Sequence, residues 1–253
     1  MSTSKIALVT GGSRGLGKDM ALNLAKKGLD VILTYHTQQA AADGVVAEIE
    51  ALGQRAVALP LDAARVGTFG AFFEQVRAAL CTTFGAERFD FLINNAGTGL
   101  YAPFAETTEQ QFDELLNIHL KGPFFLTQQA LPLLNDGGGI VNISSGLTRI
   151  TFPGSSAYAS LKTAVETLTK YQAKELASRR IRANIVAPGA IETDFGGGRT
   201  RDNKEINAHI ASLTSMGRVG LPTDIGSVVA FLCTPEAGWI DAQRIEVSGG
   251  QAI

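Results

Sequence analysis

The chain has little of what marks several classes of protein. It is 253 residues long, yet only 18% of these residues are charged and the net charge is −2. With no excess of positive charge, the sequence does not favour binding to nucleic acid or to an anionic membrane surface. No apolar run reaches the roughly 18 residues of a membrane span. We therefore expect a small-molecule partner, with no nucleic acid and no membrane.

Cysteine and histidine are also scarce, and neither follows a metal-binding pattern. The two cysteines, Cys81 and Cys233, share no ligand spacing and lie in helical patterns beside apolar neighbours, which predicts buried free thiols. The three histidines also lack ligand spacing, so we expect no metal site; they are His36, His119 and His209. The first residues lead into a strand without the apolar region of a signal peptide, and we expect a cytoplasmic protein.

What is present is a regular alternation of strand and helix patterns. Short β-branched runs alternate with helical periodicity along the whole chain, which is typical of an α/β fold with a parallel sheet covered on both faces. We expect one domain, residues 1–253, because open α/β sheets of this size commonly form one. The expected strands are Ile6–Thr10, Val31–Tyr35, Ala56–Leu59, Phe89–Asn94, Ile140–Ser144, Arg182–Ala187 and Arg244–Val247.

The helical segments carry three local signals. Apolar stripes predict buried faces for Val66, Phe69, Phe73, Val76 and Leu80, and for Leu161, Val165, Leu168 and Leu176. Pro123 falls inside the helical pattern 112–134 and lacks an N–H, so that helix should kink or break there. The glycines at 196–198 predict a flexible stretch, and we expect residues 195–216 to form a mobile lid, with a permanently docked surface helix as the alternative. Within it, the spacing of Ile206, Ile210 and Leu213 predicts a short apolar helical face that completes the pocket.

A glycine-rich turn joins the first expected strand to the first helix. Its sequence is TGGSRGLG, residues 10–17. A strand, a glycine turn and a helix N-terminus together favour the pyrophosphate of a dinucleotide; the alternative is a tight turn with no ligand. Gly11 permits the turn, and Gly15 and Gly17 let backbone and cofactor approach each other. We expect cofactor contacts from Gly11, Ser13, Arg14, Gly15, Leu16 and Gly17.

Tyr158 and Lys162 lie four residues apart, which places phenol and ammonium on one helix face. Tyrosine is a poor acid near neutrality because its pKa is about 10, and a neighbouring cation lowers that pKa. Ser145 precedes Tyr158 by thirteen residues and can hold a substrate oxygen against the phenol. The absence of a G-x-S-x-G pattern around Ser145 argues against a hydrolase nucleophile. This set of residues indicates carbonyl and alcohol chemistry.

Four motifs in this order resemble those of the short-chain dehydrogenase/reductase family. They are TGGSRGLG at 10–17, NNAG at 94–97, Ser145 with YASLK at 158–162, and PGAIET at 188–193. The resemblance extends from Lys5 to about Gly250. It implies a doubly wound Rossmann-like sheet in the order 3-2-1-4-5-6-7, a homotetramer, and a carbonyl reductase in which Tyr158 is the acid and Lys162 lowers its pKa and holds the ribose.

The second strand predicts which cofactor is used. NAD-binding relatives place an acidic residue about twenty residues beyond the glycine turn, against the ribose 2′-hydroxyl. This chain has Tyr35 there and no carboxylate in residues 34–37. Arg14 resembles the basic residue that pairs with the 2′-phosphate of NADP, and His36 could add to that pocket. NADP is therefore expected, with NAD as the alternative and a solvated surface arginine as the alternative for Arg14.

The resemblance implies further site residues. Asp62 would bond to adenine, although an isolated aspartate is more often a turn or capping residue. Asn117 would hold a water in a proton relay behind Lys162. Asn94 is expected mainly to tie strands together, and it is also expected among the cofactor contacts, with Ala96 and Gly97. The last motif would lie along the nicotinamide, where Thr193 could also cap a helix; its expected contacts are Pro188, Gly189, Ile191 and Thr193.

Two departures from the family's common patterns lie near the end of the chain. DAQR at 241–244 stands where many relatives have a small residue and glycine before the glutamine, and SGG at 248–250 where many have an aspartate. We expect both to be remote from the chemistry and to affect only subunit contacts.

The sequence leaves the substrate open between a 3-oxoacyl thioester, a free ketone, a sugar and a steroid. Two other classes share the family's fold. Halohydrin lyases have a disrupted glycine turn and an arginine in place of the lysine, whereas Gly11, Gly15, Gly17 and Lys162 are intact here. Nucleotide-sensing regulators should lack the tyrosine, and Tyr158 is present.

Overall fold

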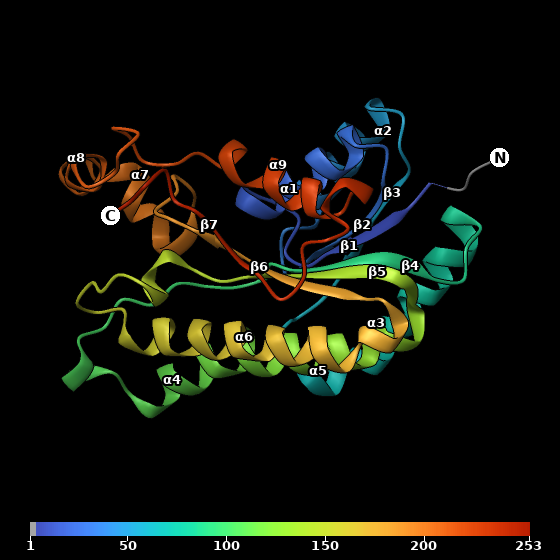
Figure 1. Ribbon diagram of the computed structural model, residues 1–253, viewed down its shortest axis with the longest axis horizontal. Helices are drawn as coiled ribbons and strands as arrows, with labels where there is room; N and C mark the ends of the chain where they lie inside the picture. Colours follow the sequence, from blue (N-terminus) through green and yellow to red (C-terminus); the bar gives the residue numbers. More distant parts are fainter. Residues whose placement is uncertain (1–3) are drawn as a thin grey trace.

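The computed structural model describes residues 4–253, which form a seven-stranded parallel sheet between two layers of helices (Figure 1). The strand order is β3-β2-β1-β4-β5-β6-β7, as expected. Residues 1–3, which belong to the expected domain 1–253 and to the N-terminal stretch used for the cytoplasmic prediction, lie outside the described residues. The strands are β1 (Ile6–Val9), β2 (Asp30–Tyr35), β3 (Ala56–Pro60), β4 (Phe89–Asn94), β5 (Leu134–Ile143), β6 (Arg182–Pro188) and β7 (Arg244–Val247).

Strand ends agree with the sequence to within one residue except in β5. That strand begins at Leu134, which pairs with Phe89, rather than at Ile140. A register irregularity follows, and regular pairing resumes where Gly139 meets Phe91. The sequence NDGGG at 135–139 has the composition of a turn, which hid this early pairing. A Cβ at Gly138 would lie 2.2 Å from the carbonyl oxygen of Asp90, so only glycine fits there.

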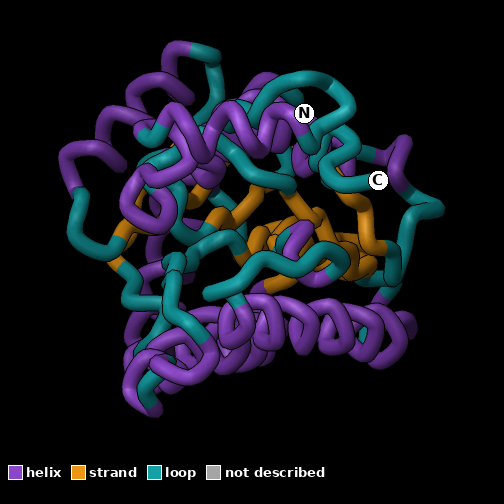
Figure 2. Tube along the Cα trace, turned by 90° about the vertical axis from the view of Figure 1, so that its left-hand side faces the viewer, coloured by secondary structure: helices purple, strands orange, loops and turns teal. Residues whose placement is uncertain are grey.

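Helices α1 (Gly15–Lys26), α2 (Gln39–Ala51) and α9 (Thr223–Leu232) cover one face of the sheet (Figures 1 and 2). Ala7 and Val9 of β1 point into this layer, whereas Ile6 and Leu8 point into the other, as the two-residue period of a strand requires. Helices α1 and α9 approach closely at Gly226, whose N–H donates to Asp19 Oδ2 at 3.0 Å.

The opposite face is covered by α3 (Phe69–Ala79), α5 (Gly122–Ala130) and α6 (Ser156–Glu175), with α4 (Glu109–Leu116) beyond them (Figure 1). Two short helices, α7 (Arg199–Asp202) and α8 (Lys204–Ser212), lie at the carboxyl edge of the sheet. The expected stripe on α3 is buried from Phe69 onward, but Val66 is half-buried in a preceding 3₁₀ turn. On α6, Leu168 is only half-buried, and Thr169 takes the inward position instead, with its hydroxyl donating to Val165 O.

The helix around Pro123 is interrupted, as expected. Helix α4 ends at Leu116, residues Asn117–Lys121 form a π-helical segment η4, and α5 begins at Gly122. A wider turn before Pro123 accommodates the missing N–H. A Cβ at Gly122 would lie 2.3 Å from the carbonyl oxygen of Ala63, so glycine also allows the close approach of the chain after β3.

Only one of the two thiols is buried as the sequence predicts. Cys233 is buried, and burial raises the pKa of its thiol to about 12. Cys81 is exposed, so its predicted burial is wrong. It lies on the outward side of the π-helical segment Leu80–Phe84, whose first and last residues face the core. Within residues 4–253, no three His, Cys, Asp or Glu side chains are grouped to hold a metal ion, and none of the helices there is both long and apolar enough to span a membrane.

Candidate active site

A cleft of about 1400 Å³ runs along the carboxyl ends of the strands. It lies where the strand order reverses between β1 and β4, which is the usual ligand position in open parallel sheets. Most of the residues singled out from the sequence line it: Gly11, Ser13, Arg14, Gly15, Leu16, Gly17, Tyr35, His36, Asp62, Ala96, Gly97, Ser145, Tyr158, Lys162, Pro188, Gly189, Ile191 and Thr193.

The glycine turn is shaped for close backbone approach. Gly11 has a φ of +67°, and its N–H donates to Thr34 Oγ1 at 3.0 Å. A Cβ at Gly17 would lie 2.0 Å from the carbonyl oxygen of Gly11, so no other residue fits there. Asn95 braces the turn by donating from Nδ2 to the carbonyl oxygens of Thr10 (2.8 Å) and Gly11 (3.2 Å). The N-terminus of α1 therefore opens directly onto the cleft.

Three candidate cofactor residues in the cleft contact other protein groups: His36 and Asp62, which follow β2 and β3, and Arg14 of the glycine turn. His36 Nε2 lies 3.7 Å from Asp62 Oδ2, and Asp62 Oδ1 accepts a hydrogen bond from Ala64 N at 3.0 Å. The hydrogen bond from Ala64 N is the turn role that the sequence analysis gave as the alternative for Asp62. Arg14 Nη1 lies 3.3 Å from Asp194 Oδ2, so Arg14 forms an exposed ion pair with the segment that follows β6.

Ser145, Tyr158 and Lys162 meet on the wall formed by the end of β5 and the first turns of α6. Tyr158 and Lys162 are 9% and 6% exposed. Lys162 Nζ donates to Ile143 O at 2.8 Å and lies 5.6 Å from the centroid of the Tyr158 ring. Ser145 Oγ accepts a hydrogen bond from Leu147 N at 3.2 Å.

Burial acts on these titratable groups in opposite senses. It raises the pKa of the Tyr158 phenol above its ordinary value, and the hydrogen bond with Ser145 lowers that pKa again. Burial lowers the pKa of Lys162 from 10.5 to about 8, so its ammonium is retained at neutral pH. In this structure Lys162 faces the ring and a carbonyl. Its expected lowering of the Tyr158 pKa stays a prediction.

The segment after β6 lines the cleft, and hydrogen bonds fix its backbone. Ala190 N donates to Gln251 Oε1 at 2.9 Å, and Glu192 N donates to Gly220 O at 2.9 Å, which fixes the residues on both sides of Ile191. Thr193 Oγ1 accepts a hydrogen bond from Phe195 N at 3.2 Å, so in this structure Thr193 caps the turn that follows it.

Comparison with known proteins identifies the same family that the sequence motifs resemble, over nearly the whole chain. A family model described as Enoyl-(Acyl carrier protein) reductase matches residues 11–252. The "Hydroxynaphthalene reductase-like protein Arp2" of Metarhizium brunneum (strain ARSEF 3297) is 36% identical over 97% of this chain and 94% of its own length. The chain belongs to the short-chain dehydrogenase/reductase family.

Solved structures of related reductases superpose closely. The reductase LugOII, described as promiscuous and as catalysing keto-reduction at C1 during lugdunomycin biosynthesis, is 39% identical with a TM-score of 0.94, covering 99% of both chains. The angucycline C-6 ketoreductase LanV with bound NADP is 36% identical with a TM-score of 0.94, covering 99% of this chain and 96% of its own. A second LanV structure, with NADP and rabelomycin, is 37% identical with a TM-score of 0.90 and covers 99% of this chain and 97% of its own.

Two asparagines of this short-chain dehydrogenase/reductase do not line the cleft. Asn94 is buried and donates from Nδ2 to Asn142 Oδ1 (2.8 Å) and Thr127 Oγ1 (3.0 Å), which ties β4 to β5 and α5. Its predicted cofactor contact is therefore not supported by its position. Asn117 begins the π-helical segment η4, and the neighbouring residues Ile118 and His119 line the cleft in its place.

His119 is a site residue that sequence reasoning missed. Its ring is 1% exposed and packs edge to face on Tyr158, with centroids 5.0 Å apart. Its Nε2 lies 2.7 Å from Thr98 O, which makes Nε2 the protonated nitrogen. Burial, and then the charge of Lys162, lower the pKa of His119 to about 3, so the ring is neutral. The sequence signal was its place two residues after Asn117, before the interruption at Pro123.

The opposite wall comes from the expected lid segment. Phe195 packs against Tyr158, with ring centroids 5.8 Å apart, and Ile206 and Ile210 also line the cleft. Leu213, expected on the same apolar face, is instead 38% exposed at the end of α8. The guanidinium of Arg199 lies 4.4 Å from the centroid of the Tyr101 ring at the rim.

The departure at 241–244 is not remote from the chemistry, so that expectation is wrong for Arg244. From β7, Arg244 Nη2 reaches the carbonyl oxygen of Ser145 at 3.3 Å. Asp241 has a structural role, because its Oδ1 accepts hydrogen bonds from Ala183 N and Ala242 N at 2.9 and 3.0 Å. Sequence spacing did not reveal the Arg244 contact, since β7 and the Ser145 loop are about 100 residues apart in the chain.

Proposed function

We propose that this protein is an NADPH-dependent ketoreductase, reversible as an alcohol dehydrogenase, whose substrate is a fused-ring aromatic ketone. The reaction rests on one observation: Ser145, Tyr158 and Lys162 line the same cleft as the glycine turn. The substrate class is supported by the names of the related reductases LugOII, LanV and Arp2. Aromatic side chains in the cleft offer flat apolar faces to fused rings; they are Tyr101, Phe152 and Phe195.

The chain's residues fit NADPH. The turn at Gly11 and Gly17 leaves room for backbone contact with a pyrophosphate at the N-terminus of α1. Arg14 supplies a guanidinium suited to a 2′-phosphate, and residues 34–37 contain no carboxylate to repel one. When bound, NADPH supplies the hydride that passes from nicotinamide C4 to the carbonyl carbon. NAD is the alternative cofactor.

The remaining chemistry belongs to side chains of this protein. Ser145 donates its hydroxyl hydrogen to the carbonyl oxygen and holds the ketone against Tyr158. Tyr158 donates a proton to that oxygen as the carbon is reduced. The Lys162 ammonium stabilises the resulting phenolate, which is how it lowers the pKa of Tyr158, and it holds the ribose. Asn117 supports reprotonation through a relay behind Lys162.

We also propose that residues 195–216 act as a lid and that the chain works as one dinucleotide-binding domain within a cytoplasmic homotetramer. Glycines 196, 197 and 198 all have positive φ values of 60° to 77°, which suits a hinge. Closure of this segment would exclude water from the carbonyl and complete the substrate pocket.

The test is turnover of 1-tetralone, a small fused-ring aromatic ketone, followed by loss of NADPH absorbance. We expect turnover with NADPH, weaker turnover with NADH, and a lower kcat/KM for cyclohexanone, which lacks the aromatic ring. Equal rates for both ketones would contradict the proposal that the substrate is an aromatic ketone. Binding of NADPH without turnover of any ketone or alcohol would favour a nucleotide sensor, and failure to bind it would favour the lyase.

A further inference from the structure

A carboxylate on α6 connects the helix of Tyr158 and Lys162 to the loop of Ser145. Glu166 lies one turn beyond Lys162 on the same helix face. Its Oε1 accepts hydrogen bonds from Ser144 Oγ at 2.7 Å and Thr148 Oγ1 at 2.8 Å. These two residues flank Ser145, so a single oxygen holds both sides of the residue that would orient the substrate.

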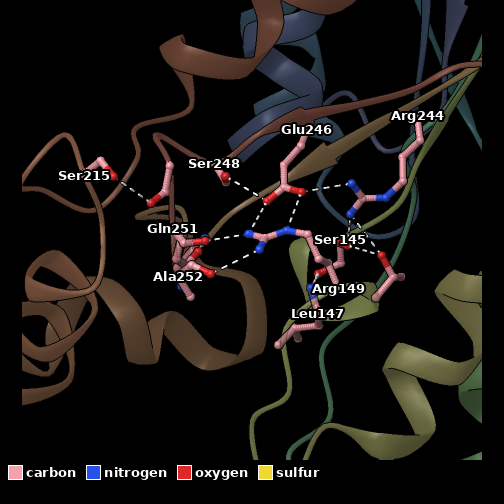
Figure 3. A network of polar contacts seen from close by, with 12 residues as sticks. Ser145, Leu147, Arg149, Ser215, Arg244, Glu246, Ser248, Gln251 and Ala252 are labelled. Carbon is pink, nitrogen blue, oxygen red and sulfur yellow. Dashed lines mark hydrogen bonds and ion pairs between the residues drawn. The ribbon is translucent and has the colours of Figure 1, made fainter.

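Arg244 completes this contact from β7. Its Nε donates to Glu166 Oε1 at 2.8 Å, and its Nη2 donates to Thr148 Oγ1 at 3.0 Å and to Ser145 O at 3.3 Å. Figure 3 shows Arg244 reaching from its strand toward Ser145. Thr148 Oγ1 also lies 2.9 Å from Ser145 O, and its single hydroxyl hydrogen is shared between that oxygen and Glu166 Oε1.

The network extends to the segment expected along the nicotinamide (Figure 3). Glu246 joins Arg244 (3.0 Å) to Arg149, whose Nε and Nη2 bind both Glu246 oxygens at 2.8 and 2.7 Å. Arg149 also donates to Gln251 O, and the Gln251 side chain accepts from Ala190 N at 2.9 Å. Hydrogen bonds therefore run from α6 through the Ser145 loop to the segment after β6.

These side chains are largely withdrawn from water. Side-chain exposures are 17% for Glu166, 24% for Arg244 and 21% for Glu246. Ion pairs removed from solvent give little net stability, because desolvation offsets their attraction. The fixed geometry of such a pair instead determines where the residues bonded to it lie. Here those residues are Ser144 and Thr148 on either side of Ser145, and Glu166 itself lies one helical turn from Lys162.

We propose that Glu166, with Arg244 as its counterion, is a positioning residue that fixes Ser145 relative to Tyr158. The inference rests on the proposed function, since it assigns Glu166 a role through Ser145. With Gln in place of Glu166, the acceptor oxygen loses its negative charge, so the hydrogen bonds from the hydroxyls of Ser144 and Thr148 weaken and Arg244 loses its counterion. Ser145 then shifts from the position in which its hydroxyl and the Tyr158 phenol meet one oxygen atom.

The test is a double-mutant cycle between Glu166→Gln and Ser145→Ala, measured with NADPH and 1-tetralone. Glu166→Gln alone should lower kcat about 10- to 100-fold, the range expected from a small misplacement of a reacting group, while the Kd for NADPH stays unchanged. In the Ser145→Ala background, Glu166→Gln should have little further effect on kcat, because Glu166 acts through Ser145. Arg244→Lys, which keeps the charge, should retain more activity than Arg244→Gln.

Asp136→Asn is the matched control, because Asp136 forms a 2.7 Å ion pair with Arg179 that does not contact the cleft. Thr148→Val removes one hydroxyl of the network and keeps the test available if Glu166→Gln does not fold. Equal losses from Glu166→Gln with and without Ser145 would overturn the proposal, as would full activity of both Glu166→Gln and Thr148→Val. If Ser145→Ala itself kept full activity, the proposed function would fail instead.

Discussion

The two walls of the cleft differ in how their polar side chains are paired. On the wall of Ser145 and α6, Glu166 and Arg244 are 17% and 24% exposed and form an ion pair with each other. On the wall formed by residues 195–216, the ion pairs are surface contacts. Asp194 is 45% exposed and pairs with Arg14 and Arg201, which are 64% and 45% exposed.

In the proposed mechanism, this difference separates the wall that carries out proton transfer from the wall that contacts the substrate. Removing one partner of a buried ion pair costs about 3–5 kcal/mol and an exposed pair contributes about 0–1 kcal/mol, and the half-buried pair of Glu166 and Arg244 lies between these limits. The first wall therefore holds one geometry, which proton transfer from Tyr158 requires. The second wall can rearrange at little cost, and its glycines at 196–198 favour that.

The largest effect should come from the rigid wall. Tyr158→Phe removes the proton donor but leaves the glycine turn and Arg14 in place. Turnover should fall at least ~10²-fold, the low end of what positioned acid catalysis contributes. Fluorescence titration should show NADPH binding unchanged. Near-normal turnover of this variant would take the acid role away from Tyr158.

Hydrogen exchange compares the two walls directly. Amides of α6 from Ala159 to Ala173 should exchange at least ~100-fold more slowly than those from Gly196 to Leu213 in the unliganded protein, because exposed segments open locally at low free energy. NADPH together with a ketone analogue should slow exchange only in the second segment. Strong protection of Gly196 to Leu213 without ligand would rule out the lid and leave a docked surface helix.

The charge of Lys162 makes the first wall sensitive to pH. Burial lowers its pKa to about 8, so the ammonium is present below that pH and lost above it. Because kcat/KM for NADPH reports the free enzyme, it should fall about tenfold per pH unit above that pKa. Circular dichroism at each pH controls for unfolding. A kcat/KM that stays level well above this pH would show that the charge of Lys162 is not required.

The rigid wall was also the more predictable from sequence. Tyr158 and Lys162 belong to one helix, and helical periodicity alone brings them together. The strand order and most strand ends also followed from local patterns and the family resemblance. His119 and Arg244 were missed, because each reaches the wall through contacts that no local period encodes: a π-helical turn places His119 against Tyr158, and β7 carries Arg244 to Ser145.

Predictions on the wall of residues 195–216 depended mainly on composition, which determines less of the three-dimensional structure. All three of the glycines 196–198 have positive φ, a conformation that favours glycine, whereas the flexibility expected from them stays a prediction. Composition did not reveal that Arg14 pairs with Asp194, a contact between residues 180 positions apart. Helical spacing also predicted wrongly that Leu213 faces the pocket, because α8 ends at Ser212 and the Leu213 side chain is exposed.

Removing Arg14 tests the cofactor assignment at the junction of the two walls. Arg14→Ala should lower kcat/KM for NADPH by about tenfold or more, the range for losing a charged hydrogen bond, and leave NADH little changed, because NADH has no 2′-phosphate. Arg201→Ala is the control, since Arg201 also pairs with Asp194. A wild-type preference for NADH would show that the assignment of Arg14 is wrong.

The smallest effect should come from Asp194, which holds Arg14 through an ion pair of 3.3 Å between exposed side chains. A 2′-phosphate must compete with this carboxylate for the guanidinium. Asp194→Asn should therefore lower the KM for NADPH by up to about fivefold, the equivalent of the ~1 kcal/mol upper range of an exposed ion pair, and leave the KM for NADH unchanged. Asp202→Asn removes the same charge from a carboxylate that pairs with Arg201 and not with Arg14, so it separates this contact from a general change of charge. Equal gains for NADPH and NADH, or equal gains from both variants, would show that Asp194 does not compete for Arg14 and that the two walls are not coupled through it.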